Sequence, residues 1–519
     1  MKHLGKSILA CALCFVVVLS GCSGTVSSET AQSMSVSQST ENVVAPGNYD
    51  EHFDIDLMSY FVMDVSPDDE IIQYLNDKFN VTINPTITNW DNYASTLQMK
   101  ISAGETPDWF RVNLDSMVPQ LVDDGVVINV SDYAKNYGFK NIQATLESPL
   151  ANLLERDGSF YCVPDSTGYL TFGIYVRKDW MDELGLEVPT TWEAYKDVLK
   201  AFADADLDGK GATPLTTYGD GITSGVLNFY SCWTGYNTWG YLNDELQYFA
   251  TDPAYKECIK YWADLYANGL IDPELFSNSY EDCMTKFDTG RAGMLMMNQV
   301  QIWWDTNESA MKEYDPSSEM MSFVPIPAGP AGSHVNHGIP YAASSYFSSE
   351  MSEAKRIRVL EIMDYLLSDE GRELTLYGIE GKHHTVVDGQ KVQNADVVNK
   401  EWGQSIHLMG ELADFGASQD LTTSEWVQSY VDWLDTPGNA EYNYAQYFST
   451  DETVKLSTNI LEVYQSYFVS FITGEKDVDT EWNAYVEAMN NAGVPELTKL
   501  TDEFIKANGY DADMVHVTR

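Results

Sequence analysis

Apolar and polar residues alternate strictly over residues 53–57, where the sequence is Phe-Asp-Ile-Asp-Leu. Such alternation is typical of a strand with one buried face. Residues 66–69, Ser-Pro-Asp-Asp, then supply a cap, a proline for the first helical position and acids for the first turn of a helix. The apolar side chains of this helix share one face: Ile71, Leu75 and Phe79. A β-branched run at 81–83 follows, which predicts a strand–helix–strand unit with parallel strands.

The same alternation of helices and short strands continues along the chain. After Pro253, apolar residues recur at helical spacing until Gly269 ends the pattern: Tyr255, Ile259, Trp262 and Tyr266. A strand is predicted at 173–176, and a later helix is predicted from the spacing of Ile357, Leu360, Met363 and Leu367. The pattern therefore predicts the α/β class, and the chain is long enough for two lobes with separate cores.

The amino-terminal residues follow a different pattern. Lys2 and Lys6 precede an apolar run at 8–19, which is too short for a membrane span and is typical of a secretory signal. Residues 19–22, Leu-Ser-Gly-Cys, resemble a bacterial lipobox, in which the cysteine receives a diacylglyceryl group and becomes the first residue after cleavage. We therefore expect a signal peptide at 1–21 and lipidation of Cys22 with acyl chains of the palmitate type. A plain signal peptide with a chance cysteine is the alternative.

Residues 22–47 are predicted to connect this lipid anchor to the folded part as a flexible tether. From 23 to 45 the chain is Ser, Thr, Gln and Val with few charges, a composition that buries too little apolar surface to fold. No later segment is apolar enough to span a membrane. The folded protein is therefore expected on the extracellular face of the cell membrane.

Charge narrows the class of ligand. The chain has 78 acidic and 30 basic residues and a formal net charge of -48. A field of this sign repels nucleic acid, and it also disfavours polyanionic glycans. A neutral ligand is favoured unless a local basic pocket overrides the field.

The cysteines do not form the dense pattern of a disulfide scaffold. Cys11 and Cys14 leave with the signal peptide, and four remain beside the lipidation site: Cys162, Cys232, Cys258 and Cys283. Their spacing shows neither paired metal ligands nor a nucleophile signature, so buried reduced thiols are expected. A single disulfide among them is the alternative.

Seven segments of the chain follow a recognisable pattern. The most specific is 175–195, which contains Tyr-Val-Arg-Lys-Asp-Trp and Pro-Thr-Thr-Trp-Glu-Ala-Tyr. The other six are 106–108, 120–125, 268–274, 287–294, 324–330 and 377–385. In this order they resemble the extracellular solute-binding proteins of family 1, the oligosaccharide-binding group of ABC importers, and especially its lipoprotein branch. The resemblance covers nearly the whole mature chain.

The resemblance implies a two-lobe periplasmic-binding-protein-like fold of type II. Lobe 1 is expected at 48–168 and 335–380, and lobe 2 at 169–334 and 381–519. Hinge crossings are expected at 169–171, at 334–338 and near Gly381. A ligand would lie in the cleft between the lobes, and contacts with both lobes would couple closure to occupancy.

The resemblance also implies the function, which is capture of an oligosaccharide and its delivery to the permease subunits of an ABC importer. It implies no enzymatic activity and no cofactor. An exported carbohydrate-active enzyme and a surface sugar sensor remain alternatives. Chance pairs of carboxylates are common in so acidic a chain, and no Gly-x-Ser-x-Gly, phosphate-loop or His-Glu-x-x-His motif occurs. His383 and His384 invite a metal hypothesis, but adjacent strand residues point to opposite faces, and the resemblance implies a structural role.

A sugar needs aromatic rings for its C–H faces and polar groups for its hydroxyls. The candidates in lobe 1 follow a strand or a helix-to-loop turn, and capping or core packing is their alternative role: Trp90, Asp91, Asp108 and Trp109. In lobe 2, an aromatic segment without helical period is predicted to be a loop on the wall of the cleft. It contains Phe229, Tyr230, Trp233, Tyr236, Asn237 and Trp239, with packing in the lobe's core as the alternative.

The strongest candidate segment follows a buried strand predicted at 294–297, where the family usually has sugar-contacting residues. It contains Asn298, Gln299, Gln301, Trp303 and Trp304. Two adjacent tryptophans cannot both face one ligand, so one of the pair is expected to pack in the lobe. His337 and Tyr341, at the second crossing, are further candidates.

Residues 204–210 contain oxygen ligands at alternate positions and a glycine at the turn, as a calcium loop requires. The candidate ligands are Asp204, Asp206, Asp208 and Lys210. Ala212 and Thr213 occupy places where similar proteins have acids, and Leu215 stands where an EF-hand has Glu. A structural calcium ion is therefore one hypothesis, and a simple acidic turn is the other.

Overall fold

The computed structural model describes residues 45–60, 69–88, 90–113, 117–148, 151, 154–168, 172–207, 209, 211, 213–219, 229–298, 301–321, 324–332, 335–336, 339–387, 390–394, 440–441 and 444–519. The expected signal peptide, Cys22 and most of the expected tether lie outside these residues. Within them, no helix has both the length and the hydropathy of a transmembrane span.

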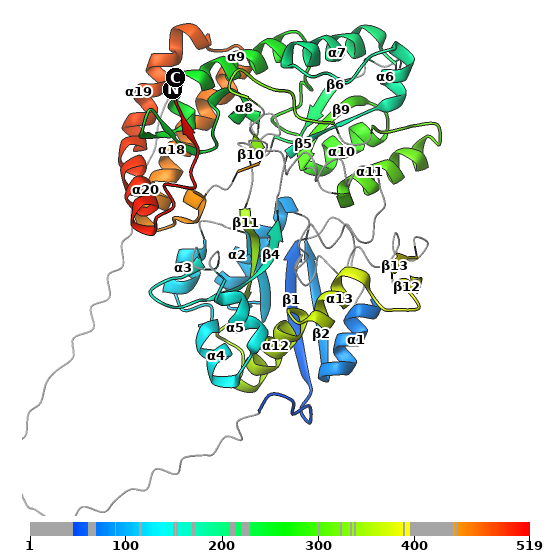
Figure 1. The fold of residues 1–519 in the computed structure, drawn as a ribbon, viewed down its shortest axis with the longest axis vertical. Helices are drawn as coiled ribbons and strands as arrows, with labels where there is room; N and C mark the ends of the chain where they lie inside the picture. The colour runs from blue at the N-terminus through cyan, green and yellow to red at the C-terminus, as the bar shows by residue number, and fades with distance from the viewer. Residues whose placement is uncertain are drawn as a thin grey trace, which may run out of the picture. The chain divides into compact units, whose positions relative to one another are not determined.

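A five-stranded sheet forms the first body, in the order β2-β1-β3-β11-β4 (Figure 1). Its strands are β1 (Phe53–Tyr60), β2 (Val81–Thr88), β3 (Trp109–Asn113), β4 (Cys162–Gly168) and β11 (Ile339–Phe347). Strand β1 pairs in parallel with β2 and β3, whereas β11 runs antiparallel to β3 and β4. The predicted parallel strand–helix–strand opening is confirmed.

Helices cover both faces of this sheet. One face packs against α1 (Glu70–Phe79), α4 (Val130–Tyr137), α5 (Lys140–Leu146) and α12 (Glu353–Leu366), and the other against α2 (Trp90–Ala103) and α3 (Val118–Asp123). The alternation of strand side chains explains the two cores, because Leu57 points into the first and Met58 into the second. Helix α1 buries the predicted apolar face, but its cap is Asp69, which accepts hydrogen bonds from the backbone of Ile71 and Ile72. The expected capping residues before Asp69 lie outside the described residues.

The first described residues are fastened to α12 by Arg358. Its buried guanidinium donates to the backbone oxygen of Asn48 at 2.5 Å and to that of Phe79, and it lies 4.7 Å from the ring centroid of Tyr49. The Tyr49 hydroxyl in turn donates to Glu361 at 2.8 Å. These contacts hold the chain at the edge of the sheet where β1 and β2 begin.

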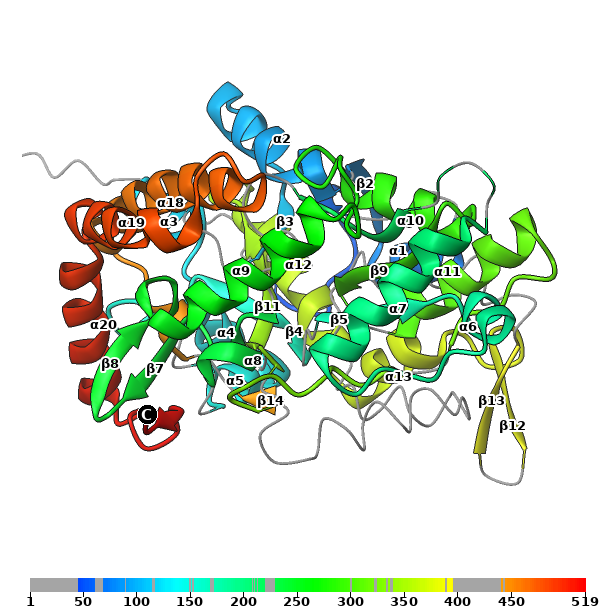
Figure 2. The ribbon, with the colours of Figure 1, turned by 90° about the horizontal axis from the view of Figure 1, so that it is seen from above.

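A three-stranded sheet in the order β5-β9-β6 forms the second body, whose helices can be followed in Figure 2. Its strands are β5 (Phe172–Val176), β6 (Thr213–Thr217) and β9 (Ala292–Asn298). One face packs against α6 (Lys178–Leu184), α7 (Trp192–Ala205) and α9 (Pro253–Ala267), and the other against α10 (Tyr280–Asp288) and α11 (Gln301–Tyr314). The strands predicted at 173–176 and 294–297 and the helix predicted after Pro253 are confirmed.

The carboxyl-terminal helices extend the core of the second body. Helices α18 (Asp451–Ile472) and α19 (Val478–Ala492) pack on α9, and α20 (Val494–Asn508) packs on α18 (Figure 2). Tyr255 of α9 and Tyr464 of α18 share a hydrogen bond of 2.6 Å between their buried hydroxyls. A small sheet, β15-β7-β8, joins the last residues to this core through β7 (Trp239–Leu242), β8 (Glu245–Tyr248) and β15 (His516–Val517).

Strands β4 and β5, on either side of 169–171, belong to different sheets. The crossings expected at 169–171 and 334–338 stay predictions. The hairpin of β12 (His384–Val387) and β13 (Gln390–Gln393) remains attached to the first body. Lys382 pairs with Glu70 of α1, and Lys391 pairs with Glu373 of α13 (Asp369–Tyr377). The boundary expected at Gly381 remains a prediction, and these contacts favour moving it beyond Asn394.

The four mature-chain cysteines are buried thiols, and no disulfide joins them in the part of the chain that is described. Burial raises the pKa of the Cys232 thiol to about 12 and holds that of Cys258 well above its ordinary value. Thiols held in this neutral form are poor nucleophiles and poor metal ligands. The expectation of buried reduced thiols is confirmed.

Asp288, near the end of α10, is expected to make stability fall as pH rises. Its Oδ1 atom is buried without a hydrogen-bond partner among the described residues, and burial raises the pKa to about 7 although Arg177 lowers it. In the unfolded chain the pKa of Asp288 is near the ordinary value of about 3.9. The folded protein therefore loses stability as the pH rises from this value to the folded pKa, and the loss is complete at higher pH. We expect Asp288→Asn to raise the melting temperature at pH 8 and to have little effect at pH 4.

Asp282, in the first turn of the same helix, is the matched control. Hydrogen bonds from the backbone and hydroxyl of Ser279 lower the pKa of Asp282, so Asp282→Asn should lower the melting temperature at pH 8. Equal melting temperatures for wild type and Asp288→Asn at pH 8 would contradict the assignment.

Candidate ligand-binding site

The strands of the first body end at one edge of its sheet, which we call the first carboxyl edge. Strands β1, β2, β3 and β4 run in the same direction, and β11 begins where they end. The residues at this edge are Tyr60, Thr88, Asn113, Gly168 and Ile339. Ligands of open α/β sheets bind outside the carboxyl ends of the strands.

The second body has a corresponding edge, the second carboxyl edge. Strand β9 ends there at Asn298, which is paired with Phe172, the first residue of β5. Strand β6 runs parallel to β9 and ends at Thr217. Helix α11 begins at Gln301, directly after this edge.

The chain links the two carboxyl edges directly. Strand β4 ends at Gly168 and β5 begins at Phe172, so three residues separate the two sheets. A fully extended chain advances at most about 3.6 Å per residue, which limits the distance between these two Cα atoms to about 14 Å. Both edges therefore contribute to one region, which is the candidate site.

Candidates predicted in lobe 1 fall at opposite edges of the first sheet. Trp90 and Asp91 begin α2 just after β2 ends, and Tyr341 lies near the start of β11, so all three belong to the first carboxyl edge. Asp108 and Trp109 lie at the other edge, where β3 begins. His337 is outside the described residues.

The contacts of Asp108 and Trp109 are those of structural residues. Trp109 has 0% exposure, and its indole N–H donates to the Ser345 hydroxyl at 2.8 Å. Asp108 accepts a hydrogen bond of 2.8 Å from the backbone of Asp56 and pairs with Lys355 at 2.5 Å. The alternative of capping or core packing accounts for both residues.

The strongest predicted segment follows the second carboxyl edge, as expected. Asn298 is the last residue of β9, Gln301 is the first of α11, and Trp303 and Trp304 lie in the first turn of that helix. Gln299 is outside the described residues. The backbone therefore brings four of the five candidates to the region that Trp90, Asp91 and Tyr341 also approach.

The aromatic rings of 229–239, predicted to lie in a loop on the wall of the cleft, follow the alternative of packing in the lobe's core. The segment contains the one-turn helix α8 (Ser231–Thr234) and the start of β7, and the rings of Phe229, Tyr230, Trp233, Tyr236 and Trp239 are buried in the core. The ring centroids of Trp233 and Trp192 lie 5.1 Å apart, and those of Trp239 and Tyr248 lie 4.9 Å apart. Packing in the lobe's core accounts for the two tryptophans, with Trp192 of α7 beside one and Tyr248 of the adjacent strand β8 beside the other.

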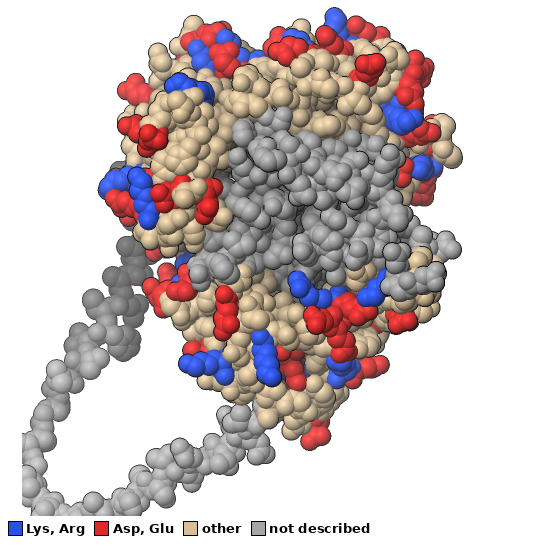
Figure 3. Space-filling view, in the orientation of Figure 1, with Lys and Arg blue, Asp and Glu red and all other residues tan. Residues whose placement is uncertain are grey.

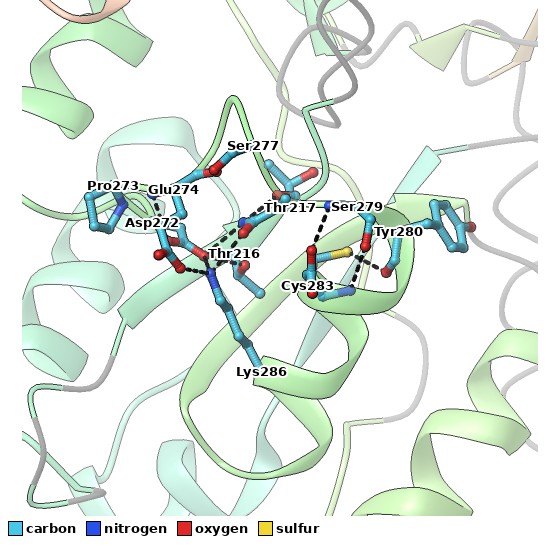
Figure 4. A network of polar contacts seen from close by, with 12 residues as sticks. Thr216, Thr217, Asp272, Pro273, Glu274, Ser277, Ser279, Tyr280, Cys283 and Lys286 are labelled. Carbon is cyan, nitrogen blue, oxygen red and sulfur yellow. Dashed lines mark hydrogen bonds and ion pairs between the residues drawn. The ribbon is translucent and has the colours of Figure 1, made fainter. Parts of the chain in front are cut away.

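A buried carboxylate that the sequence did not single out anchors the second carboxyl edge (Figure 4). Asp272 accepts hydrogen bonds from Thr216 at 2.7 Å, from Asn278 at 2.9 Å and from Lys286 at 2.8 Å. Asn278 also donates to the backbone oxygen of Thr217, the last residue of β6, at 3.1 Å. Burial raises the pKa of Asp272, but the hydrogen bonds from Lys286, Thr216 and Asn278 outweigh it and lower the pKa. The end of β6 is thus fixed to α10.

The candidate calcium loop is only partly described. Asp204 is exposed near the end of α7, and Asp206 caps that helix in a left-handed conformation, with Oδ1 accepting from the backbone of Gly211 at 2.6 Å. Asp208 and Lys210 are outside the described residues. Leu215, which stands where an EF-hand has Glu, is buried in β6 and has no oxygen to offer an ion. The described residues contain no group of three or more His, Cys, Asp and Glu placed for a metal. A bound ion remains a hypothesis.

His383 and His384 are both buried and contact the turn that follows α13. His383 Nδ1 accepts from the backbone N–H of Ile379 at 2.8 Å, and His384 Nδ1 lies 2.7 Å from the backbone oxygen of Tyr377. These backbone contacts are consistent with a structural role.

Sequence comparison identifies the family of the chain. Residues 64–373 match the family described as bacterial extracellular solute-binding protein. The polygalacturonan/rhamnogalacturonan-binding protein YtcQ of Bacillus subtilis is 22% identical, over 94% of this chain and 96% of its own. The fructooligosaccharide ABC transporter substrate-binding protein FusA of Streptococcus pneumoniae is 23% identical, over 84% and 86%. Lipoprotein LipO of B. subtilis is 26% identical, over 72% of each chain.

Solved structures share the fold. The alginate-binding protein AlgQ2, solved without calcium ion, has a TM-score of 0.71 at 18% identity and covers 88% of this chain and 98% of its own. FusA, solved as an EF-hand mutant with fructo-nystose, has a TM-score of 0.68 at 19% identity and covers 89% and 100%. The expected two-lobe α/β fold is confirmed.

The Asp272 network should contribute strongly to stability. Asp272→Asn leaves the half-buried Lys286 ammonium facing a neutral amide and should lower the free energy of unfolding by about 3 kcal/mol, measured by urea denaturation. Glu274 pairs with the same lysine, but its side chain is 66% exposed, so Glu274→Gln should change the stability by less than about 1 kcal/mol. If both variants lowered the free energy of unfolding by similar amounts, burial of Asp272 would not be the source of the stabilisation.

Proposed function

The chain belongs to the bacterial extracellular solute-binding proteins, and from this premise we propose that it is the sugar-capturing subunit of an ABC importer. In this proposal a neutral oligosaccharide binds at the two carboxyl edges and is delivered to the permease subunits. Closure of the two lobes around the ligand follows from contacts made at both edges.

The observation that carries this proposal is the composition of the two linked edges. Aromatic, amide and carboxylate residues occur at the ends of strands from both sheets: Trp90, Asp91, Asn298, Gln301, Trp303, Trp304 and Tyr341. Indole rings suit the C–H faces of sugars, and amides suit the paired donors and acceptors of their hydroxyls.

The ligands named for related proteins include both acidic and neutral glycans. YtcQ is named for polygalacturonan and rhamnogalacturonan, and AlgQ2 for alginate, whereas FusA has been solved with kestose and with fructo-nystose. A formal net charge of -48 favours the neutral class for this chain. On the face that Figure 3 shows, acidic side chains occur on the described surface of both bodies, and many of the basic ones lie beside them.

We further propose that the protein is held at the extracellular face of the membrane by lipidation of Cys22, with the tether at 22–47 between the lipid and the folded part. The sequence at 19–22 supports this proposal, and so does the lipoprotein name of LipO, which aligns with 72% of this chain. The related proteins are named as binding proteins rather than enzymes, in accord with capture without turnover.

Binding can be measured by thermal shift with a panel of neutral oligosaccharides, uronate oligosaccharides, amino acids and peptides. A ligand that binds only the folded state adds about 2.7 kcal/mol of stability at a concentration of one hundred times its Kd. We expect a neutral oligosaccharide to give the largest increase in melting temperature. A response confined to amino acids or peptides would reject the sugar assignment, and one confined to uronates would reject the neutral class.

The two tryptophans at the start of α11 should differ in their effect on binding. We expect one of Trp303→Ala and Trp304→Ala to weaken the affinity by about tenfold or more, because about 1.4 kcal/mol corresponds to a factor of ten. Tyr314, at the end of the same helix, is 61% exposed, so Tyr314→Ala is a matched control that should leave calorimetric affinity unchanged. If neither tryptophan variant alters affinity while both remain folded, α11 does not supply the platform.

A further inference from the structure

Residues 217–219, which we call the exit of β6, are held by one turn of the chain. The side-chain N–H of Asn278 donates to the backbone oxygen of Thr217, the last residue of β6, at 3.1 Å (Figure 4). The backbone oxygen of Asn278 accepts from the N–H of Gly219, also at 3.1 Å. Between these two contacts, the ring of Tyr218 packs against that of Tyr280, with their centroids 5.0 Å apart. The exit of β6 is therefore fixed to the start of α10 at three successive residues.

Gly219 lies directly against the backbone of this turn. A Cβ atom at residue 219 would lie 1.7 Å from the backbone oxygen of Leu275, far inside contact distance. Glycine is the residue that allows two backbone segments to approach so closely. A side chain at this position would force the exit of β6 away from the turn.

The Asn278 amide has a single orientation, which its neighbours determine. Its NH₂ group faces two acceptors, the Thr217 oxygen and the Asp272 carboxylate at 2.9 Å, and its Oδ1 accepts from Lys286 at 2.8 Å. The opposite orientation would set an oxygen against both acceptors. Asn237, predicted as a ligand contact, is buried in the turn between α8 and β7, and its Oδ1 has no hydrogen-bond partner among the described residues. The amide of Asn278, in contrast, is fully used by contacts within the protein.

The exit of β6 is joined to the strand that carries a candidate ligand residue. The Thr217 hydroxyl donates to the backbone oxygen of Met296 in β9 at 2.8 Å, and the two residues are paired in the parallel ladder. Strand β9 ends two residues later at Asn298, a candidate of the proposed site. Displacement of Thr217 would therefore be transmitted to the end of β9 through this hydrogen bond and the ladder.

We propose that Asn278 is a positioning residue, which holds the exit of β6 so that the second carboxyl edge has its ligand-binding arrangement before the ligand arrives. This role rests on the proposed function and concerns the same site. Asn278 does not contact the ligand, because it is 4% exposed and its amide is bonded within the protein. It acts through Thr217 on the end of β9.

Ordering of the edge before binding raises affinity, because association otherwise includes the entropy lost when binding groups are immobilised. In the wild type this ordering takes place on folding. Without the amide, the Thr217 oxygen and the Asp272 carboxylate each lose a donor, and the exit of β6 can separate from the turn. Part of the ordering then takes place only when the ligand binds, so the affinity falls while the protein remains folded.

Asn278→Ala tests this role with the neutral oligosaccharide that raises the wild-type melting temperature most in the panel. We expect calorimetry to show an affinity about tenfold lower, at a temperature where circular dichroism shows the variant to be folded. Amide hydrogen exchange at 215–219 should be faster in the ligand-free variant and return to the wild-type rate when the ligand saturates it. Gly219→Ala keeps every hydrogen-bonding group and displaces the same exit, so it should weaken binding as well.

Asn141→Ala is the matched control. The Asn141 amide donates to the backbone oxygen and to the carboxylate of Asp364, at 2.9 and 3.1 Å, which are the two kinds of acceptor that Asn278 also has. It joins two helices of the first body, α5 and α12, rather than the end of a strand. Its removal should lower the melting temperature and leave the affinity unchanged.

The outcomes separate this role from the proposed function. If the wild type binds a neutral oligosaccharide and folded Asn278→Ala or Gly219→Ala binds it equally well, the positioning role is overturned while the proposed function stands. An equal loss of affinity in Asn141→Ala would also overturn it, since general destabilisation would then explain the result. If the wild type binds no oligosaccharide in the panel, the proposed function itself fails.

Discussion

The shortness of the chain between Gly168 and Phe172 is the constraint on which the candidate site depends. One residue ends a strand of the five-stranded sheet and the other begins a strand of the three-stranded sheet. Strand pairing, parallel for some neighbours and antiparallel for others, fixes the direction of the remaining strands and so gathers polar and aromatic residues at these two edges. The binding region is therefore a consequence of topology more than of any single side chain.

Each body also contains a buried acid that ties a strand to a helix. Asp272 joins the end of β6 to Lys286 of α10, at the second carboxyl edge. Asp108 joins the backbone of β1 to Lys355 of α12, at the edge of the first sheet opposite the candidate site. A buried carboxylate is tolerated only when it is bonded, and both of these accept hydrogen bonds and pair with a lysine.

Periodicity predicted the regular elements correctly because burial on one face leaves a repeating trace in the sequence. Ile71, Leu75 and Phe79 show this for α1, and the strand at 294–297 shows it for β9. The family resemblance predicted the two-lobe fold. Aromatic residues in irregular segments carry no such trace, since a ligand platform and a core ring have the same composition. Trp233 illustrates this, because its packing partner Trp192 is distant in sequence.

The polar contacts that position the site could not be predicted from the sequence either. Nothing near Asp272 indicates that Lys286 will reach it, and nothing near Tyr236 indicates a bond to Asp252. Such pairs form only when separate helices and strands are already packed, so local propensity does not encode them.

Arg358 determines the edge of the first sheet at which the described chain begins. Its bonds to Asn48 and Phe79 fix the start of the folded chain at the edge where β1 and β2 begin, opposite the edge where they end. A membrane attachment ahead of residue 45 would therefore enter the first body at the edge opposite the candidate site. The lipid end of the chain and the ligand would then occupy different surfaces of this body.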